Sequence, residues 1–383
     1  MNRRRFIKII GASCVVLAAP TIVTHQLSPS DDLKLRPTHT YDDIRKTLLS
    51  YAMLSANPHN TQAWKVALPR KDTILLYVDP DRLLPETDPI YRQIHIGQGA
   101  FIESLVIAAS HFGIGVHIDY FPQGEYDNQS LESKPVASIT LISEPTIAAD
   151  PLFHYLNARQ STKTPYAAEA IPRQQLNYLN QTTNNSTFQL RFVDAASDNG
   201  KMSDFLTRSM IIEEQNISRS LETISMFRFN DEEMVTQRDG FGLAQNGVTG
   251  TKRWITERLF ISREQAEADP QSFGKEGIKL TQEVANNAPH FGLLISDSNS
   301  RLDQIKAGRI YQRTNLVTAS IGLVQHPMSQ ILQEYQDMLP LQAEFKKHYE
   351  IQPKQTVQML FRLGNAPLTP PSPRREVNDI VLG

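Results

Sequence analysis

Residues 97–112 read GQGAFIESLVIAASHF, a stretch with almost no polar face. A helix that is apolar all round is buried on every side rather than along one stripe. Gly99 and Gly113 stand fourteen residues apart in this part of the chain, and Gly308 and Gly322 repeat the spacing. The repeated spacing predicts a duplicated unit whose two long helices meet in the centre of the molecule.

The elements around the two glycine pairs follow a similar order. The apolar periodicities predict helices over residues 42–54, 97–112, 173–179 and 302–320. Runs of β-branched and aromatic residues predict strands over 73–78, 115–120, 136–142, 188–193, 291–296 and 356–363. We therefore predict an α+β fold with two tandem halves, residues 38–150 and 151–383, that pack as an intramolecular pseudo-dimer.

Residues 196–289 break the symmetry, because the first half has no segment of comparable length at this place. The segment is rich in charged and amide side chains, and helical patterns cover residues 202–221 and 252–267. Two interpretations are open. The insertion is either a lid or arm over a site or an excursion on the surface.

Composition excludes several classes of function. The 383 residues are 40% hydrophobic and 21% charged, as in an ordinary globular protein. Lys and Arg number 39 against 41 Asp and Glu, with no block of basic residues, so a nucleic-acid-binding face is not expected. Cys14 is the only cysteine, which excludes a disulfide framework and a catalytic thiol elsewhere in the chain.

The common catalytic and nucleotide motifs are missing as well. The ten histidines show no HxH or HExxH spacing, so no metal site is expected. No G-x-G-x-x-G sequence follows a predicted strand, and neither a P-loop nor a G-x-S-x-G sequence occurs. These absences disfavour the standard dinucleotide-binding, NTPase and serine-hydrolase classes.

The first 30 residues have the layout of an export signal. Arg3 and Arg4 precede Phe6, Ile7 and an uncharged stretch over residues 9–23, the pattern of a twin-arginine signal. That stretch is shorter than the roughly 20 residues that span a bilayer. We expect delivery by the twin-arginine translocase to the periplasm, with membrane association if the signal is retained. Because this route moves folded proteins, a cofactor inserted before export is the first functional indication.

Three short segments could bind a ligand. Residues 55–64 form an amide-rich loop that can offer donors and acceptors, although Asn-Pro-His-Asn is also turn chemistry and Trp64 a core residue. Residues 159–163 place two cations around a hydroxyl, so that an extended chain could grip a phosphate, or they form a solvated turn. Residues 373–375 add a cationic pair after the last strand.

Together these segments resemble the FMN-binding nitroreductase superfamily, and within it the single-chain, Acg-like branch with two fused halves. The resemblance implies that the FMN phosphate is held by an Arg-x-Ser-x-Lys element, here Arg159, Ser161 and Lys163. A second clamp corresponds to Arg374 and Arg375. A turn after the second long helix, whose backbone amides face flavin N5 in the family, corresponds to Pro327, Met328, Ser329 and Gln330.

The amide loop matches a family element contributed by the partner subunit. Its matching positions are Asn57, Pro58, Asn60, Gln62 and Trp64, with Ala56 and Ala63 in place of prolines and Asn57 in place of a serine. The loop lies in the first half and the phosphate grip in the second. The resemblance therefore implies one composite site, one FMN per chain and a monomer that acts as its own dimer.

The implied function is an FMN oxidoreductase. It would pass electrons through flavin N5 to a small electron-poor acceptor such as a nitroaromatic or quinone, with NAD(P)H or another donor reducing the flavin. The cofactor performs the chemistry, so no catalytic side chain is named. The alternative is an exported, non-enzymatic flavoprotein that stores or sequesters FMN, since NAD(P)H is a cytoplasmic donor.

Overall fold

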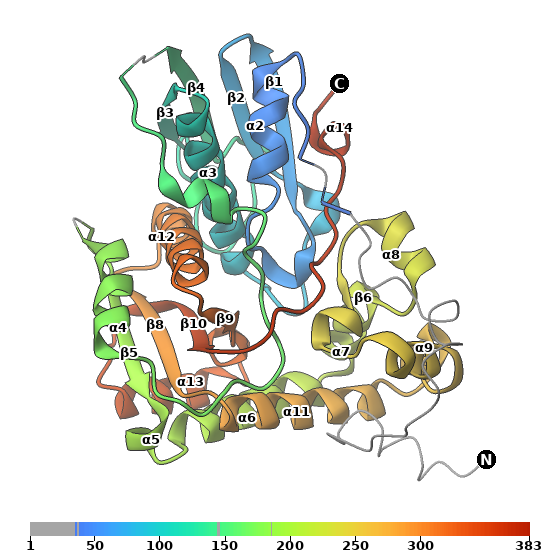
Figure 1. Ribbon diagram of the computed structural model, residues 1–383. Helices are drawn as coiled ribbons and strands as arrows, with labels where there is room; N and C mark the ends of the chain where they lie inside the picture. Colours follow the sequence, from blue (N-terminus) through green and yellow to red (C-terminus); the bar gives the residue numbers. More distant parts are fainter. Residues whose placement is uncertain (1–34, 37, 144–145, 185) are drawn as a thin grey trace.

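Two four-stranded antiparallel sheets with the same strand order form the two halves of the chain (Figure 1). The computed structural model describes residues 35–36, 38–143, 146–184 and 186–383, so the expected export signal lies outside the described residues. The first half contains α2 (Ile44–Ala52), β1 (Trp64–Arg70), β2 (Thr73–Val78), α3 (Arg92–His111), β3 (Ile114–Tyr120) and β4 (Ala137–Ser143). The second contains α4 (Arg173–Asn180), β5 (Gln189–Asp194), β8 (His290–Ser296), α12 (Arg301–Ser320), β9 (Val324–Pro327), α13 (Leu339–His348) and β10 (Thr356–Gly364).

The two sheets match strand for strand. The first has the order β1-β2-β4-β3 and the second β5-β8-β10-β9, and every neighbouring pair in both is antiparallel. In each half the long helix follows the second strand of the sequence, so α3 corresponds to α12. The predicted α+β class with two tandem halves is confirmed. Strands β1 and β9 were not expected, and they make the two halves more alike than the sequence suggests.

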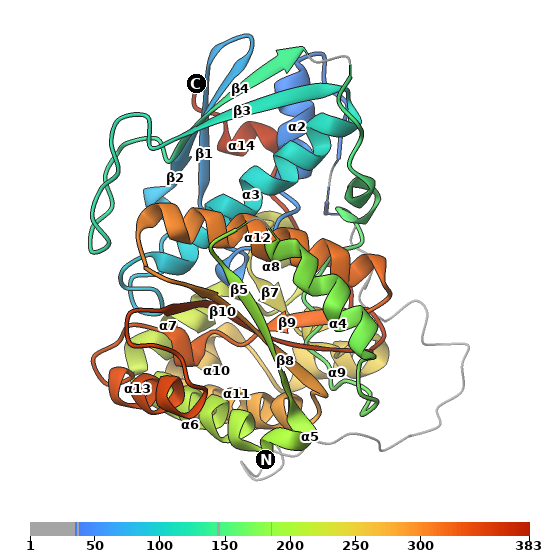
Figure 2. The ribbon, with the colours of Figure 1, turned by 90° about the vertical axis from the view of Figure 1, so that its left-hand side faces the viewer.

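The helices α3 and α12 cross between the sheets at the two glycines that the spacing singled out (Figure 2). A Cβ atom at Gly99 would lie 1.9 Å from the carbonyl oxygen of Ile305. A Cβ atom at Gly308 would lie 1.9 Å from the carbonyl oxygen of Ile96. Only glycine permits the two backbones to approach so closely, and the symmetric contacts mark the pseudo-twofold relation of the halves.

Ion pairs reinforce this crossing on one side. Glu103 of α3 is 3% exposed and accepts from Arg309 at 2.8 Å and from Arg313 at 2.7 Å, both on α12. Arg313 also pairs with Asp150, which lies between the halves in the sequence. The central interface therefore joins the halves through backbone contact and through paired buried charge.

The sheets differ in how much of each is covered. Strand β8 is buried along its whole length, with Leu294 in the core that contains α12 and Leu293 in a second core with α6 and α13. Strand β4 instead alternates between buried and partly exposed residues and becomes exposed at its end. The continuous apolar run of residues 291–296 reflects a sheet covered on both faces.

The insertion lies between β5 and β8, at the place where a short turn joins β1 to β2 in the first half. It contains α5 (Ala195–Asp198), α6 (Lys201–Gln215), α7 (Ile217–Met226), β6 (Phe227–Arg228), α8 (Asp231–Gln237), β7 (Phe241–Gly242), α9 (Gly250–Leu259), α10 (Arg263–Ala268) and α11 (Pro270–Asn286). The helical patterns over 202–221 and 252–267 are confirmed, and each is divided into two helices. Asn216 ends the first, because its backbone is extended and its side chain caps α7 by accepting from Ser218.

The C-terminal segment returns to the first half (Figure 1). After β10 it runs to α14 (Val377–Ile380), which packs against α2 and β1, and Val381 pairs with Val66 of β1. On the way, Arg374 N–H donates to the carbonyl of Leu35. The segment thus binds the two halves together and carries Arg374 past the amide loop. Among the described residues, no helix has the length and apolar character needed to cross a membrane.

Candidate functional site

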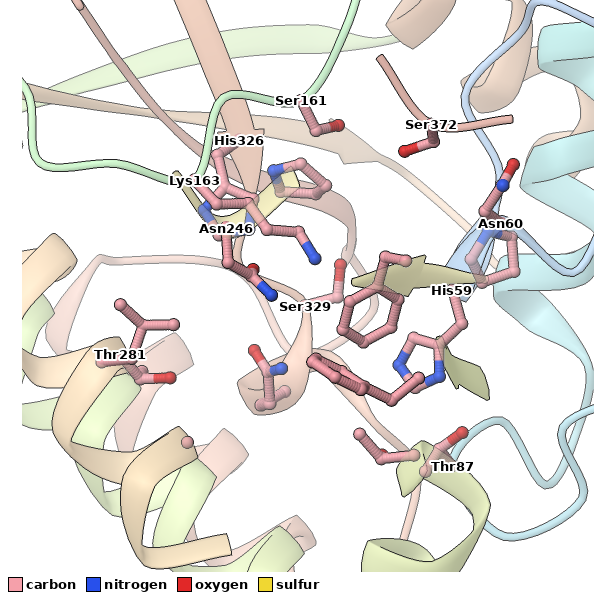
Figure 3. A pocket seen from close by; sticks show the side chains of 18 of the residues that line it. His59, Asn60, Thr87, Ser161, Lys163, Asn246, Thr281, His326, Ser329 and Ser372 are labelled. Atoms are coloured by element: carbon pink, nitrogen blue, oxygen red, sulfur yellow. The ribbon is translucent and has the colours of Figure 1, made fainter. Parts of the chain in front are cut away.

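A cavity of about 1020 Å³ lies where the first half, the second half and the insertion meet (Figure 3). The first half contributes the amide loop and the start of α3. The second half contributes the residues around Ser161 and the end of β9. The insertion closes one side with apolar residues of α11 and with Phe227 and Phe241. A cavity of this size holds a drug-sized or cofactor-sized ligand together with a second small molecule.

The amide loop presents Asn57, Pro58, His59 and Asn60 to the cavity. His59 and Asn60 have φ values of +46° and +57°, which cost energy for residues other than glycine and occur most often at functional sites. The Asn60 amide holds the loop in place, because Nδ2 donates to the carbonyls of Gly240 and Pro373 at 3.0 Å. The loop is therefore fixed from both the insertion and the C-terminal segment.

Three arginines line the cavity beside this loop: Arg36, Arg159 and Arg374. Their hydrogen bonds go only to neutral oxygens, such as the Leu54 carbonyl for Arg159 and the Asn60 Oδ1 for Arg374. In the part of the chain that the structure describes, none of the three forms an ion pair. Nε and Nη1 of Arg159 have no partner at all, although the side chain is only 3% exposed. We call these three residues the arginine cluster.

The arginine cluster is electrostatically unfavourable without a ligand. Burial, assisted by the Arg159 charge, lowers the pKa of Arg36 to about 9. Burial lowers the pKa of Arg159 to about 10. Burial and the charges of Arg36 and Arg159 together hold the pKa of Arg374 well below its usual value. A bound anion would relieve the repulsion and supply the missing hydrogen-bond acceptors.

Ser161 and Lys163 line the same cavity, but the two cations of this segment face different parts of it. The backbone is extended as expected, since Ser161 forms a bridge with Gln325 beside β9. Lys163 Nζ lies 3.7 Å from the centre of the Phe241 ring of the insertion, and burial lowers its pKa to about 8. Arg159 belongs to the arginine cluster, whereas Lys163 is free to contact another part of a ligand.

Two histidines, His59 and His326, line the cavity together with Lys163, and His326 lies beside Lys163 (Figure 3). Burial, assisted by the Lys163 charge, lowers the pKa of His59 to about 4. Burial also holds the pKa of His326 well below its usual value, with further contributions from Arg362 and Lys163. Both rings are therefore neutral at pH 7, and Nδ1 of His59 has no hydrogen-bond partner. The cavity thus offers a neutral imidazole next to a cation.

The turn after β9 reaches the cavity in part. Pro327, Ser329 and Gln330 line it, and η8 (Gln330–Leu332) begins there. Met328 points into the second core at 2% exposure, and its N–H donates to the carbonyl of Leu360 at 2.8 Å. The Met328 N–H is already hydrogen-bonded within the sheet, so it does not face the cavity.

Gln62 and Arg375 do not line the cavity. Gln62 is fully buried, donates to the Arg238 carbonyl and accepts from the Arg375 N–H. The Arg375 guanidinium lies 3.6 Å from Asp79 and donates to the Asp379 carbonyl. Both residues support the amide loop from behind. Trp64 is a core residue at 1% exposure, packed on Phe101.

Several cavity residues were not identified from the sequence. They are Arg36, His59, Phe241, Asn246, Glu213 and His326. His59 stands inside the quoted amide loop, so its position was the one available signal. The others belong to no motif, and the fold alone brings them together. In the described ranges, no group of three or more His, Cys, Asp or Glu residues could hold a metal ion.

The fold and the site together define a chain of two fused halves with one large cavity prepared for an anionic ligand. No protein-family model matches the chain. It is 23% identical over 359 residues to Rv3131 of Mycobacterium tuberculosis strain H37Rv, a protein with a provisional name as an NAD(P)H nitroreductase. This similarity covers 90% of the present chain and 93% of the relative, and MT3217 of strain CDC 1551 gives the same values.

Solved structures with some similarity are FMN-dependent nitroreductases. NfnB of Sphingopyxis sp. strain HMH has a TM-score of 0.36 at 13% identity, covering 61% of this chain and 99% of that one. NfnB of Mycobacterium smegmatis in complex with NADPH has a TM-score of 0.33 at 13% identity, covering 56% and 86%. A nitroreductase of Bacteroides fragilis with bound FMN has a TM-score of 0.33 at 12% identity, covering 57% and 89%.

Proposed function

We propose that this protein is an FMN-binding oxidoreductase of the nitroreductase type. The observation that carries the proposal is the arginine cluster: Arg159 and Arg374 are buried, the described residues give the cluster no carboxylate partner, and Nε and Nη1 of Arg159 are unpaired at the cavity. The similarity to an NAD(P)H nitroreductase over nine-tenths of both chains supports it. A flavin mononucleotide has the dianionic phosphate that such a cluster requires.

The residues present fit FMN. Arg159, Arg36 and Arg374, together with Ser161, would hold the phosphate. Lys163 and the Asn57–Asn60 loop would then contact the isoalloxazine ring, and a cation there favours its anionic reduced form. When bound, FMN supplies hydride transfer at its N5 atom, and the protein binds and orients it. One arginine cluster and one amide loop meet at this cavity, which supports one FMN per chain.

The insertion makes the rest of the cavity suitable for an uncharged, electron-poor acceptor such as a nitroaromatic or quinone. Its lining includes Phe227, Phe273 and Leu280, which provide apolar area without charge. The name of the relative supports NAD(P)H as the electron donor. Storage of FMN is the alternative outcome, and it would give a chain that binds flavin tightly but does not reoxidise it with such acceptors.

Ligand-dependent stability tests the proposal directly. FMN should stabilise the flavin-free protein by about 2.7 kcal/mol at a free concentration of 100 times Kd. Riboflavin should stabilise it far less at the same concentration, because it has no phosphate for the arginine cluster. Thermal unfolding with each ligand measures the difference. Equal stabilisation by FMN and riboflavin would show that the cluster does not bind the phosphate.

We also propose that the protein is exported by the twin-arginine route, on the sequence of its first 30 residues. Replacing Arg3 and Arg4 together by lysine keeps the charge and removes the planar guanidinium groups. We expect the precursor to accumulate in the cytoplasm, as measured by cell fractionation. An Arg45→Lys chain serves as the control, and export of the double variant at the normal level would refute this route.

A further inference from the structure

A second group of polar side chains lies in the wall of the cavity that the insertion supplies, apart from the arginine cluster. Glu213 of α6 lines the cavity and is 4% exposed. Within the described ranges it forms no ion pair. Arg219 is the cation whose charge favours the ionised form of Glu213. It is already paired with Asp337 at 2.9 Å and lies over the Tyr335 ring. A buried carboxyl group without its own cation is held most stably in the protonated form.

The hydrogen bonds around Glu213 indicate where its proton lies. The Tyr335 hydroxyl oxygen is 2.9 Å from the Thr87 carbonyl oxygen and 3.2 Å from Glu213 Oε2. A carbonyl oxygen can only accept, so the single hydroxyl proton of Tyr335 satisfies Thr87. The contact between the Tyr335 hydroxyl oxygen and Glu213 Oε2 then requires a second proton. A protonated Glu213 carboxyl group supplies it by donating to the Tyr335 oxygen. The hydrogen-bond geometry alone therefore favours the protonated form of Glu213.

Electrostatics point the same way. Burial, followed by the neighbouring Glu214, raises the pKa of Glu213 to about 8, against smaller opposing effects of Tyr335, Arg219 and Gln330. The titratable or charged groups around it are Glu214 on α6, Arg219 on α7, Tyr335 after η8 and Glu276 of α11, which also lines the cavity. Glu276 is paired with Lys279 at 2.7 Å. Glu213 is therefore a carboxyl group at this wall that can deliver a proton at neutral pH.

Glu213 lies near the turn of the proposed site that is expected to face flavin N5. Helix α6, which carries Glu213, packs against η8, which begins at Gln330, and both residues line the cavity. Gln330 belongs to the turn that, by resemblance, faces flavin N5. Thr87 and Ser329 also line the cavity (Figure 3). An acceptor bound next to this turn would lie within reach of Glu213.

We propose that Glu213 is the proton donor to the reduced acceptor, an inference that rests on the proposed FMN oxidoreductase function. An electron-poor acceptor that receives two electrons and one proton as hydride from reduced flavin becomes an oxyanion. The O–H bond of Glu213 then breaks, an O–H bond forms on the acceptor oxygen, and water returns a proton to the carboxylate. The acceptor competes with the Tyr335 oxygen for this proton. The substrate class is thus an acceptor that carries a negative charge on oxygen after reduction and takes up a proton there.

The first test is the acceptor half-reaction of FMN-loaded Glu213→Gln, followed by stopped-flow absorbance with a benzoquinone. Glutamine keeps the shape of the neutral acid but cannot give up a proton, so we expect a rate about 10²-fold lower with normal FMN occupancy. The wild-type rate should fall as pH rises through about 8, since the acid is lost there. The Glu213→Gln rate should show no such fall.

Two further variants complete the kinetic test. Glu276→Gln removes another carboxyl group from the cavity wall, and we expect its rate and pH profile to match the wild type. Lys163→Met removes a second cavity group whose pKa is about 8, and it should leave the pH-dependent fall in place. If Glu213→Gln reacts at the wild-type rate with the wild-type pH profile, or if Lys163→Met alone abolishes the fall, the inference is overturned.

A measurement without turnover gives independent evidence. The folded chain holds the Glu213 proton up to a pH of about 8, whereas the unfolded chain releases it near 4.5. The free energy of unfolding should therefore decrease as pH rises between these values, and Glu213→Gln should show a smaller decrease. An equal decrease in both would overturn the protonated state. Failure to bind FMN would overturn the proposed function itself, whereas FMN binding with an unaffected Glu213→Gln would overturn only the proton donor.

Discussion

Arg159→Ala is expected to weaken FMN binding by about 2–5 kcal/mol, on the order of 30- to 4,000-fold in Kd. The side chain is 3% exposed and offers two guanidinium nitrogens that no group in the described chain accepts from. A phosphate would take both, and alanine leaves that phosphate with fewer partners in a buried site. The apo protein should lose much less, because the substitution removes only one hydrogen bond to Leu54 and relieves repulsion with Arg36 and Arg374. Fluorescence titration with FMN measures the affinity.

Two comparisons separate phosphate recognition from general damage to the cavity. Arg159→Lys keeps the charge but cannot donate two parallel hydrogen bonds, so its affinity for FMN should lie between those of the wild type and Arg159→Ala. Riboflavin lacks the phosphate, so its weak affinity should be the same in all three proteins. If Arg159→Ala binds FMN as tightly as the wild type, the phosphate lies elsewhere.

The sequence was sufficient for most of the fold because most elements have strong local patterns. The glycine spacing located both central helices, and the crossing at Gly99 and Gly308 agrees with it. Strand β1 was missed because Lys65, Pro69 and Arg70 weaken its apolar pattern. Strand β9 has only four residues, of which one is proline. Its strand character depends on pairing with β10, a tertiary contact that no local pattern encodes.

The candidate site was predictable where it depends on short motifs. Arg159, Lys163 and Asn60 were named from the sequence, and the structure brings all three to one cavity. Arg36 was not named as a site residue, since an isolated arginine near a terminus has no distinguishing pattern. Glu213 lies about 50 residues from Lys163 in the insertion, on a helix whose end at Asn216 was also missed. Contacts of this kind follow from packing, not from spacing.

Residues of the same motif take different places in the structure, and only the structure distinguishes them. Gln62 and Arg375 belong to the same motifs as Asn60 and Arg374, yet they bond to each other behind the loop. Neighbouring residues of an extended segment point in opposite directions, so only one of Arg374 and Arg375 can face the cavity. The motif identifies the segment, and the alternation of side chains selects the residue. We therefore expect Arg374, and not Arg375, to contact a bound phosphate.

Gly308→Ala is expected to destabilise the fold strongly. The new Cβ atom would lie 1.9 Å from the Ile96 carbonyl oxygen and 2.9 Å from the Ala100 nitrogen. These are backbone atoms, so no side chain can rotate away, and α3 and α12 must separate. The free energy of unfolding should fall by about 3 kcal/mol or more, the upper end for overpacking. Urea denaturation measures this loss.

Two glycines of α3 provide control variants for this prediction. Gly97→Ala adds a methyl group to α3 two residues from Gly99, but its nearest contacts are side-chain atoms at 3.4 Å, so we expect a change within about 1 kcal/mol. Gly99→Ala should cost as much as Gly308→Ala, because its clash with the Ile305 carbonyl is the symmetric contact. The double variant should cost less than the two losses added together, since one separation of the helices relieves both clashes. Strict additivity would mean that the two glycines do not share one crossing, and the halves would then not be related by the pseudo-twofold contact that positions the cavity between them.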